Sequence, residues 1–379
     1  MQPSRRPADT PFKQQRLNAW QPILTPTYVI STFLLIGIIF IPVGITLLSQ
    51  SNNVAEITYQ YDGAGAPAGC KITANNEGKK CTIDIVATED MKAPVYVYYE
   101  LSNFYQNHRK YVKSLSFSQL RGEMVSADEL HEDCKPLDKV TEVGGAGVEL
   151  KLNPCGLIAN SMFNDKISLP QASKWTLDET NIAWESDVND KFDNPEGFKQ
   201  EECDCPGGAG VLTACTSLCG VTFDCGQKGV YFQDPDTLKC YAYEYPEDAT
   251  TQYLFESYPL IVYPAGPSPN VKNEHFINWM RTAGLPTFRK LYGSIDTDIL
   301  KGETISFDID ANFDVASFEG TKAIVISTVS WFGGKNPFLG QSYIAVGSIC
   351  VALAVAFGVK HMVSPRKLGD TRYLVWKEA

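Results

Sequence analysis

Two long stretches of the chain are apolar and uncharged, one near each end of the sequence. No charged residue occurs from Leu17 to Ala55, and the window Asn336–Val359 is also free of charge. A helix needs roughly 20 apolar residues to cross a bilayer. The pattern therefore predicts two transmembrane helices, at residues 27–49 and 337–359. The first stretch is longer than a signal-peptide core and ends without an A-x-A-like site, which argues against cleavage.

Between these stretches, apolar and polar residues alternate with the period of two that is typical of half-buried strands. The alternation is clearest in TIDIV (82–86), VYVYYEL (95–101), ISFDIDANFDV (305–315) and TKAIVISTV (321–329). One helical pattern, EHFINWMRTAG (274–284), ends at a glycine. We expect residues 50–336 to form a mainly antiparallel β domain, sandwich-like, that carries short helices.

The charges that flank the two spans predict their orientation. Segment 1–26 carries four basic residues and one acidic residue, and segment 360–379 carries five basic and two acidic residues. Because positive flanks stay on the cytosolic side, both tails are expected to be cytosolic. The central segment would then face the exterior or a lumen. The net charge of −11 argues against a nucleic-acid-binding protein, which needs a concentrated basic face.

Ten of the eleven cysteines lie in the central segment. An even set of cysteines outside the cytosol favours disulfides. The ten are Cys70, Cys81, Cys134, Cys155, Cys203, Cys205, Cys215, Cys219, Cys225 and Cys240. The last six fall within a cysteine-rich insertion at 201–240, and the sequence does not choose among their pairings. Zinc binding is the alternative for this insertion, although its spacings match no common zinc module.

No catalytic motif stands out in the central segment. Its histidines, His108, His131 and His275, lie outside any H-E-x-x-H pattern, and the chain has no G-x-S-x-G elbow and no P-loop. Neither span contains an ionisable residue with which to build an ion or substrate path. We therefore expect a non-catalytic membrane protein that works with a partner, without a cofactor or metal.

Small residues recur at helical spacing in both spans. Gly37 and Gly44 lie on one face of the first span, and Gly340 and Gly347 lie on one face of the second. A different face of the second span carries Ala345, Ser348, Ala352 and Ala356. Small side chains let helices approach closely in lipid, so these faces are predicted to contact other helices.

Several blocks of the sequence resemble one known family, and they occur in its order. They are PFKQQRLNAWQPILTP (11–26), SNFYQNHRKYVKS (102–114), PCGLIANSMFND (154–165), NEHFINWMRTAGLPTFRKLYG (273–293) and STVSWFGGKNPFLG (327–340). The family is named, in words, cell division control protein fifty. Its members are non-catalytic beta subunits of type IV P-type ATPases, the flippases that move phospholipid from the exoplasmic to the cytosolic leaflet.

The resemblance implies a 1:1 complex with such an ATPase, and a role in its folding, its exit from the endoplasmic reticulum and its transport of phospholipid. The expected locations are the endoplasmic reticulum, the Golgi or endosome, and the plasma membrane. The resemblance also implies the disulfides Cys70–Cys81 and Cys134–Cys155. Two features depart from the family. Asn18 stands where the family usually has proline, and no N-x-[ST] glycosylation sequence occurs anywhere in the chain.

The resemblance leads us to predict three surfaces that contact the ATPase. The first is the N-terminal tail, with Phe12, Lys13, Gln14, Gln15, Arg16 and Trp20. The second is the small-residue face of the second span, Ala345, Ser348, Ala352 and Ala356. The third is in the central domain, with Asn103, Phe104, Tyr105, His108, Arg109, Trp279 and Arg281. The alternatives are membrane anchoring for the tail and fold maintenance for the aromatic-rich central blocks.

Two other functions remain open on the residues alone. A surface receptor or adhesion protein would use the cysteine-rich insertion to bind a ligand, and deleting that insertion would abolish its function. An ecto-enzyme would need a catalytic group that the sequence does not reveal, and its turnover would depend on one of the three histidines.

Overall fold

The structure is a computed structural model, and it describes eleven segments of the chain. These are residues 7–17, 25–67, 69–141, 149–204, 209–212, 217–218, 221–222, 228–233, 239–246, 251–257 and 270–365. The chain divides into two compact units, which we call the helical unit and the central domain. The helical unit combines residues 1–53 with 335–379, and the central domain is residues 54–334.

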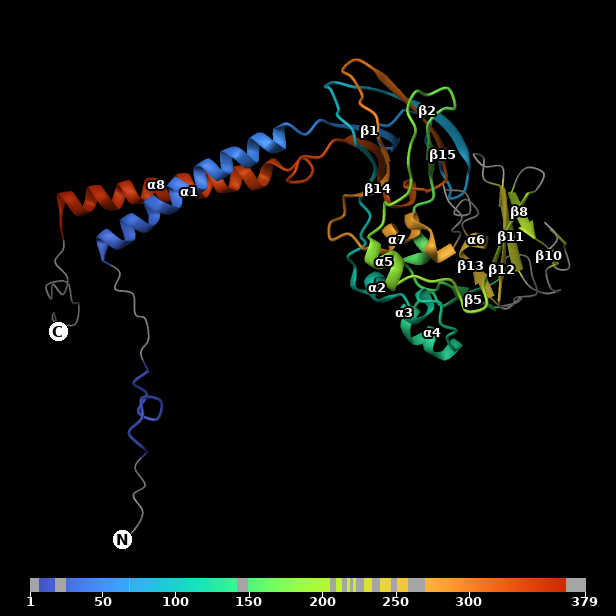
Figure 1. The fold of residues 1–379 in the computed structure, drawn as a ribbon, viewed down its shortest axis with the longest axis horizontal. Helices are drawn as coiled ribbons and strands as arrows, with labels where there is room; N and C mark the ends of the chain where they lie inside the picture. The colour runs from blue at the N-terminus through green and yellow to red at the C-terminus, as the bar shows by residue number, and fades with distance from the viewer. Residues whose placement is uncertain are drawn as a thin grey trace, which may run out of the picture. The chain divides into compact units, whose positions relative to one another are not determined.

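Two long helices form the core of the helical unit, α1 (Pro26–Asn52) and α8 (Pro337–Val363). They run antiparallel, side by side (Figure 1). Each begins at a proline that follows a capping residue: Thr25 accepts the N–H of Tyr28, and Asn336 accepts the N–H of Phe338. Within the most apolar window of each helix only 11% and 17% of the residues are buried. Both helices therefore present apolar side chains outward, as lipid-facing helices do, and are long enough to cross a bilayer.

Two antiparallel sheets face each other across the core of the central domain. One has the order β1-β16-β3-β14 and the other the order β2-β15-β6. The strands are β1 (Glu56–Gly63), β2 (Lys79–Val86), β3 (Val95–Ser102), β6 (Lys166–Ser168), β14 (Phe288–Ile295), β15 (Thr304–Ala311) and β16 (Thr321–Ser327). The expected antiparallel, sandwich-like domain with few helices is confirmed.

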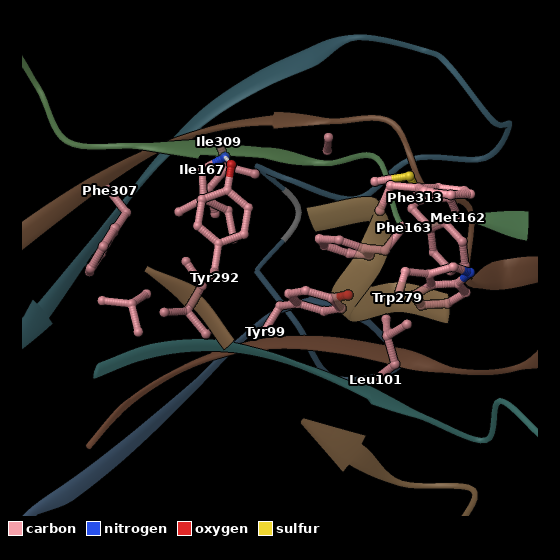
Figure 2. Packing of buried hydrophobic residues seen from close by; sticks show 14 of the residues in the cluster. Tyr99, Leu101, Met162, Phe163, Ile167, Trp279, Tyr292, Phe307, Ile309 and Phe313 are labelled. Atoms are coloured by element: carbon pink, nitrogen blue, oxygen red, sulfur yellow. Dashed lines mark hydrogen bonds between the residues drawn. The ribbon is translucent and has the colours of Figure 1, made fainter. Parts of the chain in front are cut away.

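The alternation seen in the sequence explains how the sheets meet. In β3 the side chains of Val95, Val97, Tyr99 and Leu101 are buried, while the residues between them are partly exposed. Figure 2 shows Tyr99 and Tyr292 from the first sheet opposite Ile167, Phe307 and Ile309 from the second. The Tyr292 hydroxyl accepts the N–H of Ile167 at 2.9 Å, so a hydrogen bond as well as apolar contact joins the two layers.

The described part of the central domain contains three further groups of strands. A three-stranded sheet has the order β13-β5-β4, a four-stranded sheet has the order β7-β12-β11-β8, and β9 pairs with β10. The strands are β4 (Lys139–Thr141), β5 (Glu149–Asn153), β7 (Lys199–Asp204), β8 (Ala209–Leu212), β9 (Ser217–Leu218), β10 (Val221–Thr222), β11 (Lys228–Gln233), β12 (Lys239–Tyr245) and β13 (Thr251–Tyr253). β13 runs parallel to β5, whereas the other pairs are antiparallel.

The cysteine-rich insertion belongs to this strand-rich part of the domain. The register of β7 and β12 places Cys203 opposite Cys240. Cys205, Cys215, Cys219 and Cys225 lie outside the described residues. The disulfides predicted for the insertion therefore stay predictions.

The helices that the structure describes in the central domain are short. They are α2 (Arg109–Lys113), α3 (Phe117–Leu120), α4 (Ala127–Cys134), α5 (Glu185–Asp190), α6 (Leu254–Ser257) and α7 (Glu274–Met280), with 3-10 turns η1 (Ala159–Ser161), η3 (Asn270–Lys272) and η4 (Ala316–Phe318). Ser116 and Ser126 cap α3 and α4 through their side chains. Such short helices depend on tertiary packing for their stability.

Three element ends differ from the sequence-based expectation. α7 ends at Met280 and not at Gly284. The Lys290 ammonium donates to the carbonyl oxygens of Asn278 and Arg281 there, in place of the N–H groups of a further helical turn. β15 ends at Ala311 and not at residue 315, because the next two N–H groups bond to the Asp165 carboxylate. β16 ends at Ser327, two residues earlier than the pattern.

Among the described residues, two disulfides staple the central domain. Cys70 joins Cys81 in β2, with Cα atoms 5.3 Å apart, and Cys134 at the end of α4 joins Cys155, with Cα atoms 5.8 Å apart. Both separations fall in the usual range for a disulfide. These are the two pairs that the family resemblance implied.

Buried tyrosines predict how the stability of the central domain depends on pH. Burial raises the pKa of four phenols well above the ordinary value of about 10, and raises the pKa of Tyr111 to about 12. The four are Tyr61, Tyr99, Tyr245 and Tyr292. A raised folded-state pKa gives stability that is complete below pH 10 and is lost as pH rises through the folded-state values. Burial lowers the pKa of Lys290 to about 8. The free energy of unfolding therefore increases as pH rises from 8 to 10, where the unfolded chain still binds this proton and the folded one has released it.

We therefore expect the free energy of unfolding to rise slightly from pH 8 to 10 and to fall above pH 10. Chemical denaturation of the full chain in detergent at each pH measures this, with phenolate absorbance as a second probe. The native protein should hold back a fraction of its 18 tyrosines from ionising near pH 10. A native titration in which all of them ionise near pH 10 would contradict the expectation.

Candidate partner-binding surfaces

The glycines of the two long helices meet each other. A side-chain carbon added at Gly44 would lie 2.9 Å from the Gly340 carbonyl oxygen, and one added at Gly37 would lie 3.0 Å from that of Gly347. Glycine is needed at these places because the backbones approach too closely for any side chain. The glycine faces of α1 and α8 therefore pack against each other. They leave the remaining faces of α1 and α8 for lipid or for a partner.

The second small-residue face of α8 points away from α1. Its four members are exposed on the surface of the helical unit: Ala345, Ser348, Ala352 and Ala356. On the buried side of the same helix lie Gly340, Gly347, Cys350 and Ala354. The structure therefore separates two sets of small residues that the sequence had placed on different faces. One set joins α8 to α1, and the other stays open to a further helix.

The N-terminal tail contains a compact turn. The Thr10 hydroxyl accepts the N–H of Lys13, the Arg16 N–H donates to the Pro11 carbonyl oxygen, and the Arg16 guanidinium lies 3.3 Å from Asp9. Phe12 is 76% exposed at the tip of this turn. Lys13 and Gln15 are also exposed, and Gln14 is half-buried. Trp20, the remaining predicted tail residue, lies outside the described residues.

The block after β3 divides into surface and core residues. Asn103, Tyr105, His108 and Arg109 are exposed, with Tyr105 at 57%. Phe104 is half-buried between them and contacts the rings of Tyr111, Trp279, Phe288, Phe313 and Phe318. Phe104 therefore anchors this block to the core and holds the exposed residues in place.

Trp279 lies entirely inside the central domain. Its indole N–H donates to the Ile158 carbonyl oxygen at 2.8 Å, and its exposed fraction is zero. A buried indole cannot reach a partner surface, so Trp279 maintains the fold. This corrects its predicted place among the contacting residues. The same aromatic richness that marked the block in the sequence serves the core here.

Arg281 follows directly after α7 and lies at the surface. Its guanidinium forms an ion pair with the buried Asp187 of α5 and stacks over the Trp184 ring at 4.9 Å from the centroid. The hydrogen bond from Arg281 keeps the pKa of the Asp187 carboxyl below its usual range. Trp184 is 66% exposed. No sequence pattern pointed to Trp184 and Asp187, because both are distant in the chain from Arg281.

A buried charge cluster lies where β16 begins and where β1 and β15 end. The Lys322 ammonium of β16 is 3.1 Å from Asp62, 2.7 Å from Asp165 and 2.7 Å from the Phe313 carbonyl oxygen. The Tyr61 hydroxyl donates to the same Asp165 at 2.7 Å. Burial, and then the negative charge of Asp165, raise the pKa of Tyr61. Because Asp165 also accepts two backbone N–H groups after β15, this cluster ties β1, β15 and β16 together.

Among the described residues, no group of three or more His, Cys, Asp and Glu side chains is placed to hold a metal ion. The chain has two paired apolar helices and, between them in the sequence, a disulfide-stapled β domain. These features define a two-span membrane protein with one large extramembrane domain.

Comparison with known proteins identifies the family. Residues 47–367 match the LEM3 (ligand-effect modulator 3) family / CDC50 family, and the chain belongs to this family. ALA-interacting subunit 3 of Arabidopsis thaliana is 40% identical over 98% of this chain and 91% of its own length. Cell cycle control protein 50A of Mus musculus is 38% identical over 93% and 88%. The phospholipid-transporting ATPase accessory subunit CRF1 of Saccharomyces cerevisiae is 30% identical over 98% and 89%.

Proposed function

We propose that this protein is the non-catalytic accessory subunit of a phospholipid-transporting P-type ATPase. The observation that carries the proposal is its similarity, over nearly the full length of both chains, to a protein named as such a subunit. The geometry supports it, because α1 satisfies one face of α8 while another small-residue face remains open for a partner's helix.

The finer assignments belong to the same proposal. Both tails are cytosolic, and the central domain is exoplasmic or luminal, where its disulfides are stable. The tail turn around Phe12 and the exposed residues Tyr105, His108, Arg109 and Arg281 contact the ATPase on the two sides of the membrane. The protein supports the folding of the ATPase, its exit from the endoplasmic reticulum and its transport of phospholipid to the cytosolic leaflet.

The test is purification from detergent-solubilised membranes through a tag on the C-terminal tail. We expect a large P-type ATPase to co-purify near one to one and to hydrolyse ATP when phospholipid is added. Purification of the chain alone, from membranes that contain the ATPase, would overturn the proposal and would favour a surface receptor instead.

A leucine on the open face of α8 should weaken this complex. Ser348→Leu places a bulky side chain where we propose that a partner helix packs closely, and overpacking costs about 1–3 kcal/mol. We expect the co-purified ATPase to fall by roughly tenfold, with the amount of the chain itself unchanged. Ser31→Leu on the exposed surface of α1 is the matched control. Equal recovery with both variants would place the partner elsewhere.

A further inference from the structure

A pocket of about 410 Å³ opens in the central domain, in the size range of small-ligand sites, which is about 300–1,000 Å³. Its wall is formed by segments that are far apart in the sequence. The loop before β2, η1 and the residues after it, β13 and η4 all contribute. Apart from Phe104, none of the described lining residues is among those predicted to contact the ATPase, so the pocket is treated as a separate site.

Aromatic rings form one wall of this pocket. Phe104, Phe313 and Phe318 all line it, and their ring centroids lie 5.4–6.3 Å from one another. Figure 2 shows Phe313 beside Met162, another lining residue, at one end of the core. The Asn103 side-chain amide donates to the Phe318 carbonyl oxygen at 2.6 Å and holds η4 against the block after β3. The apolar wall is therefore fixed in place before any ligand arrives.

Carboxamides line the same pocket, and each is oriented by the fold. Asn160 donates to the carbonyl oxygens of Pro154 and Gly156, Asn164 donates to the Asn76 amide oxygen at 2.6 Å, and Gln252 donates to the Ser257 hydroxyl at 3.0 Å. In these bonds Asn160, Asn164 and Gln252 use their amide nitrogens, and Asn76 uses its amide oxygen. The amide oxygens of Asn160, Asn164 and Gln252 and the amide nitrogen of Asn76 keep hydrogen-bonding capacity for a ligand.

The described lining of the pocket carries one acidic group and no basic group, which favours a neutral ligand. Among the described lining residues, Asp314 is the one ionisable group, and its carboxylate accepts the N–H of Ala316. No lysine, arginine or histidine is present among them, so a phosphate or another anion would lose its hydration without gaining a counter-charge. A neutral ligand with many hydroxyl groups suits both the amides and the rings.

We propose that this pocket binds the ring of a neutral hexose. The apolar C–H face of the sugar packs on the phenylalanine wall, and its hydroxyls exchange hydrogen bonds with the fixed amides. Asn160 and Asn164 begin no N-x-[ST] sequence, so both amides stay free of attached glycan. The hexose is presented either by a soluble or protein-borne glycan or by the headgroup of a glycolipid.

The test uses the full chain in lipid nanodiscs without any ATPase, so its outcome does not depend on the proposed function. Saturation-transfer NMR and calorimetry with mannose, glucose, galactose and their short oligosaccharides form the first arm. Flotation with vesicles that contain a monohexosyl lipid forms the second. Binding in the first arm identifies a glycan ligand, and binding in the second arm alone identifies a headgroup.

Ser317→Trp should lower hexose affinity at least tenfold, because Ser317 is exposed at the pocket and a tryptophan there fills it. Asn164→Leu should lower it similarly, and a deoxyhexose should bind more weakly than the parent sugar. Ser186→Trp, at an exposed position on α5, is the matched control and should bind as the wild type does. Absence of binding in both arms, equal binding by Ser317→Trp, or stronger binding of inositol phosphate would overturn the proposal.

Discussion

Replacing Lys322 by methionine is expected to remove about 3–5 kcal/mol from the free energy of unfolding of the central domain. The ammonium is fully buried and is the positive charge that faces Asp62 and Asp165. Methionine has a similar length but leaves both carboxylates buried beside each other without compensation. Since a folded domain is stable by only about 5–15 kcal/mol, the variant should unfold at much lower denaturant concentration or fail to accumulate.

The matched control is Lys80→Met. Lys80 lies in β2 with its side chain 83% exposed, and its ammonium is 4.0 Å from Asp310. A surface pair of this kind contributes little, so the control should stay within about 0.5 kcal/mol of the wild type. Both variants are compared as full chains in detergent by denaturant unfolding followed through tryptophan fluorescence.

A double variant isolates the reason for the loss. If the orphaned carboxylates cause it, adding Asp62→Asn to Lys322→Met should restore part of the stability, because one buried charge is removed. Additive losses, or a Lys322→Met variant no less stable than Lys80→Met, would show that the cluster does not hold the sheets together.

The charge cluster also shows where sequence reasoning reaches its limit. The alternation in β3 and β15 is local, so the strands and their buried faces were predictable from neighbouring residues. Lys322 is the second residue of β16, where a polar residue is ordinarily taken as solvent-exposed. Its burial depends on Asp62 and Asp165, which are close to it in space but more than 150 residues away in the sequence. A single sequence does not reveal which distant residues pair.

The strand β14 was missed for a related reason. Arg289 and Lys290 interrupt its apolar pattern, so FRKLYGSI did not resemble a half-buried strand. In the structure the Arg289 guanidinium bonds to Glu100 of β3 and Glu56 of β1. Lys290 caps the end of α7. Arg289 is therefore neutralised by carboxylates of other strands, and Lys290 is bound by carbonyl oxygens at the end of a helix. Glu56 and Glu100, which also lie in strands, were the sequence features that could have indicated β14.

The candidate contact surfaces were predictable only in part. The small-residue faces of the spans followed from helical spacing, and the structure adds which of them is already occupied. Residues of the central blocks were chosen by family resemblance, which does not distinguish surface from core. Tyr105 and Arg281 proved to be at the surface, whereas Trp279 is buried. The exposed Trp184 that stacks on Arg281 comes from another segment and had no signal of its own.

Leucine at Gly44 is expected to separate the two spans. Its first side-chain carbon would lie 2.7 Å from Ile344 and 2.9 Å from the Gly340 carbonyl oxygen, so the backbones must move apart. Overpacking of this kind costs about 1–3 kcal/mol, and in lipid no hydrophobic drive restores the contact. The open face of α8 would then lose its fixed orientation, and recovery of the ATPase should fall together with span packing.

The packing of the spans is measured by a disulfide between cysteines placed at Phe40 and Tyr343, whose rings face each other with centroids 5.0 Å apart. The linked peptide, counted by mass spectrometry, should decrease by about tenfold in Gly44→Leu. Gly358→Leu is the matched control in α8, because a side-chain carbon there meets no atom within 4 Å. If Gly44→Leu forms the cross-link as efficiently as Gly358→Leu, close contact through the glycines is not what pairs the helices, and both faces of α8 would be open to a partner.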